Sequence, residues 1–421
     1  MEVLDQKKRL CNSFFSDHSM SVWFNSLLFL FLLGLTTSGD GKISTLGEEP
    51  DWSELDVFQN SCTRAQFLGK LKKIYSPKEE WWAPWIQVKK QEARIRKKAN
   101  SEDWYILKFF EEIKQDEINT FGQGKKKSIR KIALDPGHIG GIYSEMEGRH
   151  FCIEGGPVVK EGGLSLRVAR RIRELLVKKG LEVFLVREKE EPVTEKRPAD
   201  FDSLAKDWLK GLNLDGIPEE EIKKLLTKRK EILFYRVSEI RARARLINEE
   251  IRPDLVICLH LNAAPWKNPD QIELVERNDY HLLVNGCYMG GELAFDDQRF
   301  ELLFRLLNGW DETERVLAED LSRSFKKKSG LPAFRYHGPN AVKVGSVPGV
   351  WGRNLLANRI YRCPVVFLEP YVANSQQMYN RIQMGDYRGH RLIGDRKLLS
   401  LVEEYAQAVV GGLHIQIQQA E

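Results

Sequence analysis

The chain has 421 residues, of which 42% are hydrophobic and 30% are charged, and its formal net charge is +5. The length predicts two or three units with enough apolar residues for a substantial core. The mild positive charge, without an arginine-rich helix or an aromatic RNA-binding motif, argues against a nucleic-acid-binding protein. None of the six cysteines forms a CxxC pair, which argues against a zinc ribbon or a thioredoxin-like site.

Residues 1–38 have the pattern of an export signal. Three basic residues at 7–9 precede an almost wholly apolar run at 22–35, and small residues follow before Gly39. This order is typical of a signal peptide. The run is shorter than the about 20 residues that span a bilayer, and an uncleaved membrane anchor and a buried helix are the alternatives. We expect export to the periplasm or the cell surface, with a mature chain that begins near Gly39.

Residues 39–127 are predicted to form a small helical module that ends in a linker. Thr63 and Gln66 fit a capping box at the start of an amphipathic helix that runs to Ile74. A second helical pattern covers residues 104–118. The module also has three clustered tryptophans, which suit stacking on sugar rings but are more often buried, and we expect them to pack against the main domain: Trp81, Trp82 and Trp85.

From residue 128 to residue 421, strand patterns alternate with helical ones. Strands are expected at residues 129–134, 181–186, 255–259, 281–284 and 364–368, and helices at 164–179, 236–251, 316–325 and 398–410. This alternation predicts an α/β fold, a twisted and mainly parallel sheet flanked by helices, as in phosphorylase- and hydrolase-like folds. A polar stretch at about 188–235, in which Pro218 begins a helix, is predicted to be a helical insertion.

Three of these strands lead to residues suited to metal chemistry. The first leads to His138, the third to His260 and the last to Glu369. Parallel strands present their carboxyl ends at one rim of an open sheet, where ligands bind, so these side chains should meet. Two imidazoles and a carboxylate suit a catalytic zinc ion with a fourth position for water, and a further carboxylate is needed to move protons. Any one of these histidines alone is equally explained by a structural role.

Four short blocks in this region resemble the zinc-dependent N-acetylmuramoyl-L-alanine amidases, the type 3 amidases of bacterial cell walls. The resemblance implies a hydrolytic enzyme with an α/β fold that binds zinc through His138, Glu161 and His260, with Glu369 as the catalytic residue. It implies hydrolysis of the amide bond between N-acetylmuramic acid and L-alanine, and peptidoglycan as the partner. The blocks follow in the family's order at residues 132–138 (IALDPGH), 161–169 (EGGLSLRVA), 258–263 (CLHLNA) and 364–369 (PVVFLE).

The sequence departs from the family pattern after the last block. The family usually has Gly and Phe after its catalytic Glu, where this chain has Pro370 and Tyr371, and the segments between the blocks are long. The departure concerns the substrate pocket more than the metal. Glu154 also precedes two glycines and is the alternative third ligand, but Glu161 has the family's spacing to the following helix. His150 is a more distant candidate.

The resemblance also implies a mechanism. Zinc lowers the pKa of its bound water towards about 7 and polarises the amide carbonyl, while Glu369 takes the proton of the water and passes it to the leaving amine. Two other functions stay open: a zinc amidohydrolase of related fold acting on a small N-acyl amino acid, and a non-catalytic wall-binding protein on an amidase scaffold. The expected export argues against the first, and the retained His138, His260 and Glu369 argue against the second. No regulator can be identified from the sequence.

Overall fold

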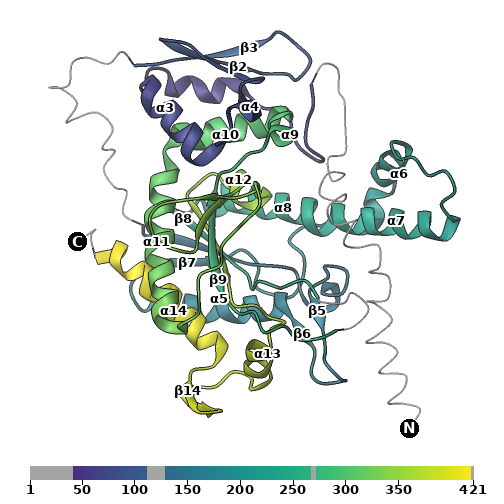
Figure 1. The fold of residues 1–421 in the computed structure, drawn as a ribbon, viewed down its shortest axis with the longest axis vertical. Coiled ribbons are helices and arrows are strands. Elements are labelled where there is room, and N and C mark those ends of the chain that lie inside the picture. Colours follow the sequence, from purple (N-terminus) through teal and green to yellow (C-terminus); the bar gives the residue numbers. More distant parts are fainter. Residues whose placement is uncertain (1–40, 111–128, 267–271, 419–421) are drawn as a thin grey trace.

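The strand patterns after residue 128 form one seven-stranded sheet in the described part of the chain (Figure 1). The computed structural model describes residues 41–110, 129–266 and 272–418. In spatial order the strands are β10 (Val342–Lys343), β11 (Val350–Arg353), β9 (Tyr280–Asn285), β12 (Val365–Pro370), β8 (Leu255–Leu259), β4 (Lys131–Pro136) and β7 (Glu182–Leu185).

Four neighbouring strands of this sheet, β12, β8, β4 and β7, are parallel. Strand β9 runs antiparallel to β12, β11 is parallel to β9, and β10 is antiparallel to β11. The predicted α/β class with a mainly parallel sheet is therefore confirmed. The direction of β9 is the exception, and its run of six buried residues does not reveal direction, because burial on both faces gives the same pattern either way.

The register brings three strand ends to one level. Leu259 in β8 pairs with Leu368 in β12 and with Pro136 in β4. His260 and Glu369 follow their paired leucines by one residue each, and His138 follows Pro136 by two. Strand β12 extends to Pro370 rather than ending at 368, so Glu369 lies inside the strand. The pairing of central strands thus fixes where the candidate residues emerge.

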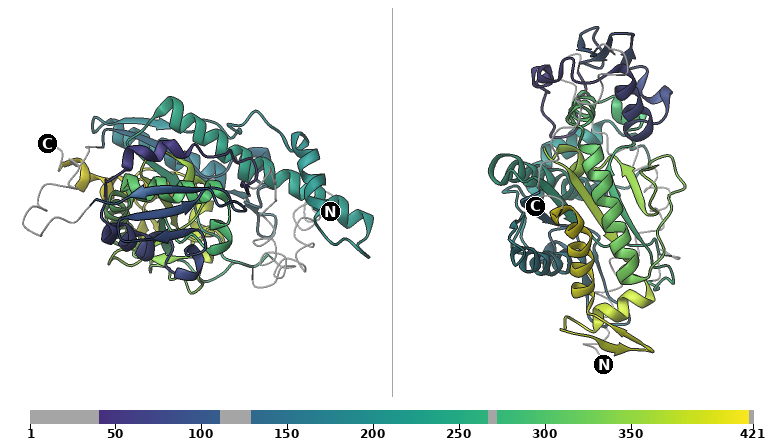
Figure 2. Two further views of the ribbon diagram at one scale, coloured as in Figure 1. Left: turned by 90° about the horizontal axis from the view of Figure 1, so that it is seen from above. Right: turned by 90° about the vertical axis from the view of Figure 1, so that its left-hand side faces the viewer.

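Successive side chains of a strand point to opposite faces of the sheet. Apolar side chains lie on both faces here, and helices cover both. Ile132 and Leu134 of β4 belong to a core with helices α5 (Glu161–Val177), α11 (Trp310–Ser329) and α14 (Leu401–Gln418). Ala133 belongs to the opposite core, with α8 (Glu239–Arg245) and α12 (Leu356–Ile360). Helix α14 packs against both α5 and α11 (Figure 2). The central strands β4, β8, β9 and β12 are therefore almost wholly buried.

The predicted helices of this region are present with shifted ends. Helix α5 begins at Glu161, three residues before the predicted start, and ends shortly before Gly180, whose φ of 82° suits a glycine. The predicted helix at 236–251 is the second part of one continuous helical run, which begins with α7 (Glu219–Ile232) and continues through η7 (Leu233–Ser238), α8 and η8 (Leu246–Ile251). It ends at Arg252, whose φ is 51°.

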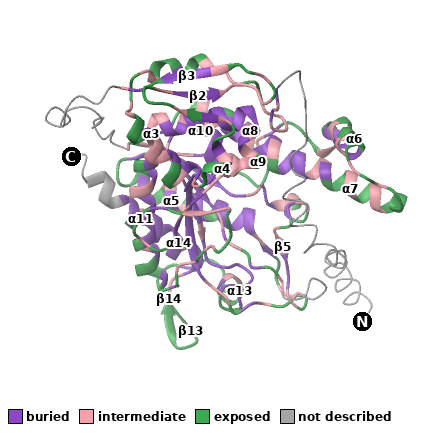
Figure 3. Cartoon of the chain, turned by 45° about the horizontal axis from the view of Figure 1, so that its top comes forward, coloured by how far each residue is buried: buried purple, intermediate pink, exposed green. Residues whose placement is uncertain are grey.

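The polar stretch at about 188–235 is helical, as expected. It contains η6 (Pro198–Phe201), α6 (Asp202–Lys210) and α7 (Glu219–Ile232), and α7 begins directly after Pro218 with three glutamates in its first turn. Acidic residues at a helix N-terminus are favourable. The pair α6–α7 projects from the body, and its outer surface is largely exposed (Figures 1 and 3).

The N-terminal module is not all helical. It has η2 (Trp52–Phe58), α3 (Arg64–Lys70), η3 (Leu71–Tyr75) and α4 (Glu79–Trp82), followed by an antiparallel sheet of β1 (Ile86–Val88), β2 (Glu92–Arg96) and β3 (Trp104–Lys108). The capping box of Thr63 and Gln66 is present. The helix predicted at 104–118 is wrong over β3, where Tyr105 and Leu107 are buried and their neighbours are not. This period of two marks a strand; residues 111–118 and the linker lie outside the described residues.

The module shares its core with a distant part of the chain. Phe67, Leu71 and Trp82 pack with Phe300 and Leu303 of α10 (Asp296–Asn308), which follows the short helix α9 (Gly290–Leu293). Trp82 is buried, and Trp85 packs on this cluster while Arg299 lies over its ring at 4.9 Å. Trp82 and the half-buried Trp85 therefore pack against the main domain, as expected.

Four short elements complete the fold around the sheet. Hairpin β5 (His150–Phe151) and β6 (Val159–Lys160) precedes α5, and η5 (Gly141–Tyr143) precedes the hairpin. Helix α13 (Gln376–Gln383) and hairpin β13 (Arg391–Ile393) and β14 (Arg396–Leu398) precede α14. The predicted export signal and Gly39 lie outside the described residues. Among the residues that are described, no helix combines the length and the apolar character needed to cross a membrane.

Candidate metal centre

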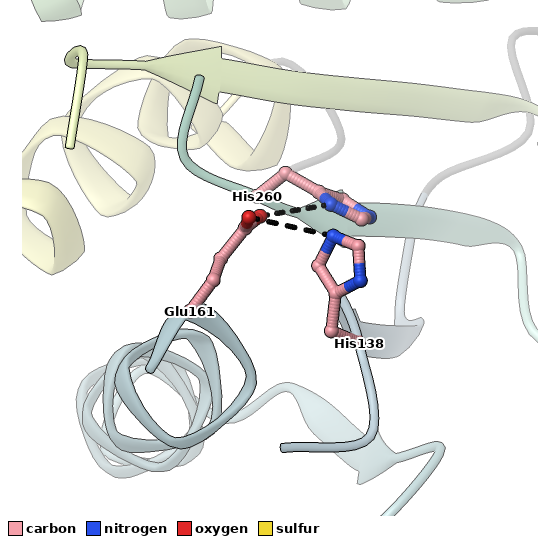
Figure 4. A group of neighbouring side chains, drawn as sticks. All are labelled: His138, Glu161 and His260. Carbon is pink, nitrogen blue, oxygen red and sulfur yellow. Dashed lines mark hydrogen bonds and ion pairs between the residues drawn. The ribbon is translucent and has the colours of Figure 1, made fainter. Parts of the chain in front are cut away.

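The ends of β4 and β8 meet the start of α5 at one rim of the sheet. Here His138, Glu161 and His260 bring their ligand atoms within 4.8 Å of one another (Figure 4). Glu161 Oε2 lies 3.4 Å from His138 Nε2, and Glu161 Oε1 lies 3.2 Å from His260 Nδ1. Glu161 is buried, whereas both histidines are partly exposed. The group therefore has one side open to solvent.

The backbone around His138 is shaped for this meeting. A Cβ at position 137 would overlap the ring of His260, so the glycine before His138 allows the close approach. His138 itself has a φ of 74°, a costly conformation for a residue with a side chain. The buried guanidinium of Arg243 donates to the His138 carbonyl at 3.2 Å and to the Pro136 carbonyl at 2.8 Å. These bonds help to hold the strained turn.

A second arginine joins the turn after β4 to helix α5. Arg187 Nη2 donates to the carbonyls of Gly137 at 3.2 Å and Gly162 at 2.6 Å. Gly162 also lies so close to Gly140 that a Cβ there would come within 2.5 Å of its backbone nitrogen. This contact explains Gly162, because the start of α5 packs directly on the turn, whereas a Cβ at Gly163 would meet the Glu190 carboxylate at 2.9 Å.

The two glutamate candidates differ clearly. Glu161 is the first residue of α5, and its Oε1 also accepts a hydrogen bond from the Leu261 backbone nitrogen at 3.0 Å. Glu154 is exposed on the preceding loop and lies outside the group. His150 is also outside it, with Nε2 3.7 Å from Glu145 Oε1. The structure thus brings Glu161, and neither alternative, to the two histidines.

Glu147 is a site residue that the sequence did not indicate. Its buried carboxylate lies 3.5 Å from His138 Nδ1 and accepts hydrogen bonds from the backbone nitrogens of Ile139 and Gly140 at 2.8 and 3.0 Å. Burial acts to raise the pKa of Glu147, but His138 and these amides outweigh it and lower the pKa. A carboxylate behind a histidine fixes which nitrogen of the ring faces a metal.

The pKa shifts of His260 and Glu161 favour the forms that bind a metal, whereas the shift of His138 has the opposite sign. Burial lowers the pKa of His260, which favours the neutral imidazole. Burial would lower the pKa of His138 as well, but Glu161 and Glu147 outweigh it and raise the pKa. For Glu161, burial acts to raise the pKa, but His138, His260 and Arg149 hold it well below its usual range. Glu161 is therefore ionised at neutral pH.

Glu369 lies beside this group without belonging to it. Two residues before it in β12, the ring of Phe367 stacks on the His260 ring, with centroids 4.3 Å apart. Burial and then the charge of Glu161 raise the pKa of Glu369 to about 8. The pKa of Glu161 is thus lowered and that of Glu369 is raised. Neighbouring carboxyl groups with opposite pKa shifts commonly have different roles in catalysis.

A buried polar cluster stands next to Glu369. In the antiparallel pair of β12 and β9, Glu369 faces His281, whose Nε2 lies 3.0 Å from the Tyr336 hydroxyl. Arg353 Nη1 also donates to that hydroxyl at 3.4 Å. Burial, with the charges of Arg353 and Arg277, lowers the pKa of His281 to about 3. Neither His281, which begins the strand predicted at 281–284, nor Tyr336 lies in one of the four sequence blocks.

Comparison with known proteins gives similar structures at low sequence identity. No family model matches the chain, and no curated protein sequence matches it. The CwlD amidase from Clostridioides difficile, solved with the GerS lipoprotein, is 12% identical, covers 69% of this chain and 99% of its own, and has a TM-score of 0.37. The N-acetylmuramyl-L-alanine amidase Ami1 from Mycobacterium abscessus is 16% identical, covers 68% and 98%, and has a TM-score of 0.36. AmiC2 of Nostoc punctiforme, an N-acetylmuramoyl-L-alanine amidase, is 13% identical, covers 70% and 98%, and has a TM-score of 0.34.

Proposed function

We propose that residues 128–421 form a zinc-dependent amidase that hydrolyses the bond between N-acetylmuramic acid and L-alanine in peptidoglycan. The observation that carries the proposal is the meeting of His138, Glu161 and His260 within 4.8 Å. These residues come from three separate sequence blocks, each of which resembles the same amidase family. Glu369, from the fourth block, stands beside them.

The three side chains fit a zinc ion. Two imidazole nitrogens and one carboxylate oxygen form a known catalytic zinc set that leaves one position for water. Ligand atoms about 2.0–2.1 Å from a tetrahedral zinc are about 3.3–3.4 Å from one another. The separations between Glu161 and the two histidines are 3.4 and 3.2 Å. Each histidine therefore lies at about this spacing from one oxygen of Glu161, His138 from Oε2 and His260 from Oε1.

The protein residues then have distinct tasks in amide hydrolysis. When bound, zinc would supply a polarised carbonyl and a water of lowered pKa. Glu161 stays ionised and holds the site with the two histidines. Glu369 would accept a proton from the attacking water in its ionised form and return it to the leaving amine. Phe367 supports the ring of His260.

Digestion of purified peptidoglycan tests this function. The zinc-loaded protein should release stem peptides with a free N-terminal L-alanine and leave the lactyl group on the glycan, as judged by mass analysis of the products. It should leave small N-acyl amino acids intact. Cleavage of those compounds alone would assign the chain to the related amidohydrolases. A zinc-loaded protein that binds the sacculi without releasing peptides would indicate a wall-binding role.

We also propose that the chain is exported to the periplasm or the cell surface. The support is the basic and apolar pattern of residues 1–38. Sequencing the N-terminus of protein from native cells should give a mature chain that begins near Gly39. A cytosolic chain that retains residues 22–35 would contradict export, and a membrane-bound chain that retains them would indicate an anchor.

A further inference from the structure

A cationic side chain of the protein itself contacts the proposed metal ligands. Arg149 Nε lies 3.0 Å from Glu161 Oε2 and 3.2 Å from His138 Nε2. These are the same two atoms that lie 3.4 Å apart and have the spacing of zinc ligands. The Nε–H group of Arg149 therefore donates to His138 Nε2 and also lies at ion-pair distance from Glu161 Oε2.

The contact defines the state of His138. A guanidinium has hydrogen-bond donors only, so His138 Nε2 must carry a lone pair to accept from Arg149. The Glu147 carboxylate faces His138 Nδ1 at 3.5 Å and suits an N–H on that atom. The lone pair directed at Arg149 is thus the one that a metal would require, and both cations need the same form of the ring.

The Arg149 side chain is placed so that it can withdraw. Its side chain is 37% exposed, against 6% for Glu161. Its other hydrogen bond within the described residues goes to the adjacent Gly148 carbonyl at 3.3 Å. The backbone is fixed, because the Arg149 nitrogen donates to Ser144 and its carbonyl accepts from the Glu161 nitrogen. The cation is therefore tethered beside the ligands while its guanidinium has access to solvent.

The Arg149 guanidinium and a divalent metal ion cannot occupy the site together, for electrostatic reasons. Without a metal, the buried carboxylate of Glu161 needs a positive partner, since an uncompensated buried charge is strongly unfavourable. With a divalent ion bound to Glu161 and His138, a guanidinium at hydrogen-bond distance from the same atoms would face strong repulsion at short range. Arg149 therefore stabilises the metal-free protein and must leave when the metal binds.

We propose that Arg149 is a built-in competitor that lowers the affinity of this site for divalent metal ions and keeps the site formed when metal is absent. The inference rests on the metal centre of the proposed function but not on the amidase reaction. In the metal-free protein Arg149 positions Glu161 and His138, and in doing so it sets the metal affinity of the site.

Zinc titration of two variants tests the proposal. Arg149→Gln removes the cation, and Arg167→Gln is the matched control, because Arg167 is a half-exposed arginine of α5 that pairs with Asp386 at 3.0 Å. Zinc affinity is measured by competition with a chromophoric chelator, and the melting temperature is measured with and without zinc. Arg149→Gln should bind zinc roughly 10- to 100-fold more tightly than the natural protein, the range expected when one charge-assisted hydrogen bond no longer has to be broken. Arg167→Gln should show the affinity of the natural protein.

The melting temperatures should separate competition from general destabilisation. Metal-free Arg149→Gln should melt below the natural protein, and the difference should shrink or reverse with zinc. If metal-free Arg149→Gln does not fold, Arg149→Lys keeps a charge without the rigid planar fork and should still bind zinc more tightly than the natural protein. Equal or weaker zinc affinity in the folded variants would overturn the proposal, as would absence of zinc binding in every protein. Tighter binding in a protein without amidase activity would support it while refuting the proposed function.

Discussion

Buried charges are arranged differently at the metal centre and around helix α10. Arg299 and Arg305 of α10 are almost completely buried, and each pairs with one carboxylate and donates to at least one backbone carbonyl. Arg299 pairs with Asp296 and donates to the Leu293 carbonyl at 2.7 Å. Arg305 pairs with Glu314 and donates to the Tyr361 carbonyl at 2.9 Å. These arginines tie α10 to its neighbours.

At the metal centre, the partners of the Glu161 carboxylate can be replaced. The two oxygens of Glu161 face two partly exposed imidazoles and one partly exposed arginine. Charges around α10 thus have fixed partners, whereas Glu161 has partners that a metal ion can replace. The difference predicts that substitutions around α10 cost stability and that substitutions at the centre cost metal and activity.

Removal of a proposed ligand should have the largest effect on function. His138→Ala, Glu161→Ala and His260→Ala should each weaken zinc binding by more than about 100-fold, beyond the loss typical of residues that only support a ligand, and should abolish hydrolysis. The circular dichroism spectrum should stay that of the folded sheet. Glu154→Ala is the control and should keep its zinc after dialysis. Full zinc occupancy in a ligand variant would remove that residue from the centre.

Glu369→Gln should separate catalysis from metal binding within the centre. Gln has nearly the same shape but cannot accept the proton, so turnover should fall by about 10²–10⁴-fold while the zinc content stays unchanged. Zinc content, melting temperature and amide cleavage are measured on one preparation. Loss of zinc would make Glu369 a ligand, and a zinc-loaded, active variant would show that another group moves the proton.

Arg305→Met should show the opposite behaviour from the ligand variants. It leaves Glu314 buried without its partner, which should lower the free energy of unfolding by about 3–5 kcal/mol. Zinc bound per folded molecule should not change. Urea denaturation measures the loss, and the double variant with Glu314→Leu should recover much of it. If Arg305→Met lost zinc while its stability stayed unchanged, the proposed difference between the α10 region and the metal centre would be wrong.

Glu147→Gln should have the smallest effect of the four. The amide no longer supplies a charged acceptor behind His138 Nδ1, so zinc affinity should fall by about 10- to 100-fold. Glu145→Gln is the control, since Glu145 is exposed on the same loop. An unchanged zinc affinity in Glu147→Gln would show that the carboxylate only braces the turn through Ile139 and Gly140.

The sheet and its rim could be predicted because buried strands have strong sequence signals. The apolar run of β8 leads straight to His260, and parallel pairing with β4 and β12 places the three strand ends together. The same logic could not find Glu147 or Arg149. They lie on a loop whose path depends on contacts with the start of α5, and such contacts leave no periodic pattern.

The N-terminal module was harder to predict because its elements depend on distant residues. Strand β3 is five residues long, and its inward Tyr105 and Leu107 pack in a core completed by α10. Short strands of this kind resemble helical segments when the apolar residues are few. The capping box at Thr63 was predictable because its hydrogen bonds are local to the sequence.

X-ray absorption spectroscopy of the zinc-loaded protein tests the metal centre most directly. We expect one zinc ion per chain with two imidazole nitrogens and one or two further oxygen ligands at about 2.0–2.2 Å, and no sulfur. The imidazole signal should fall by half in any zinc that His260→Ala retains. A shell with sulfur, or one of oxygen alone, would contradict a centre built from His138, Glu161 and His260.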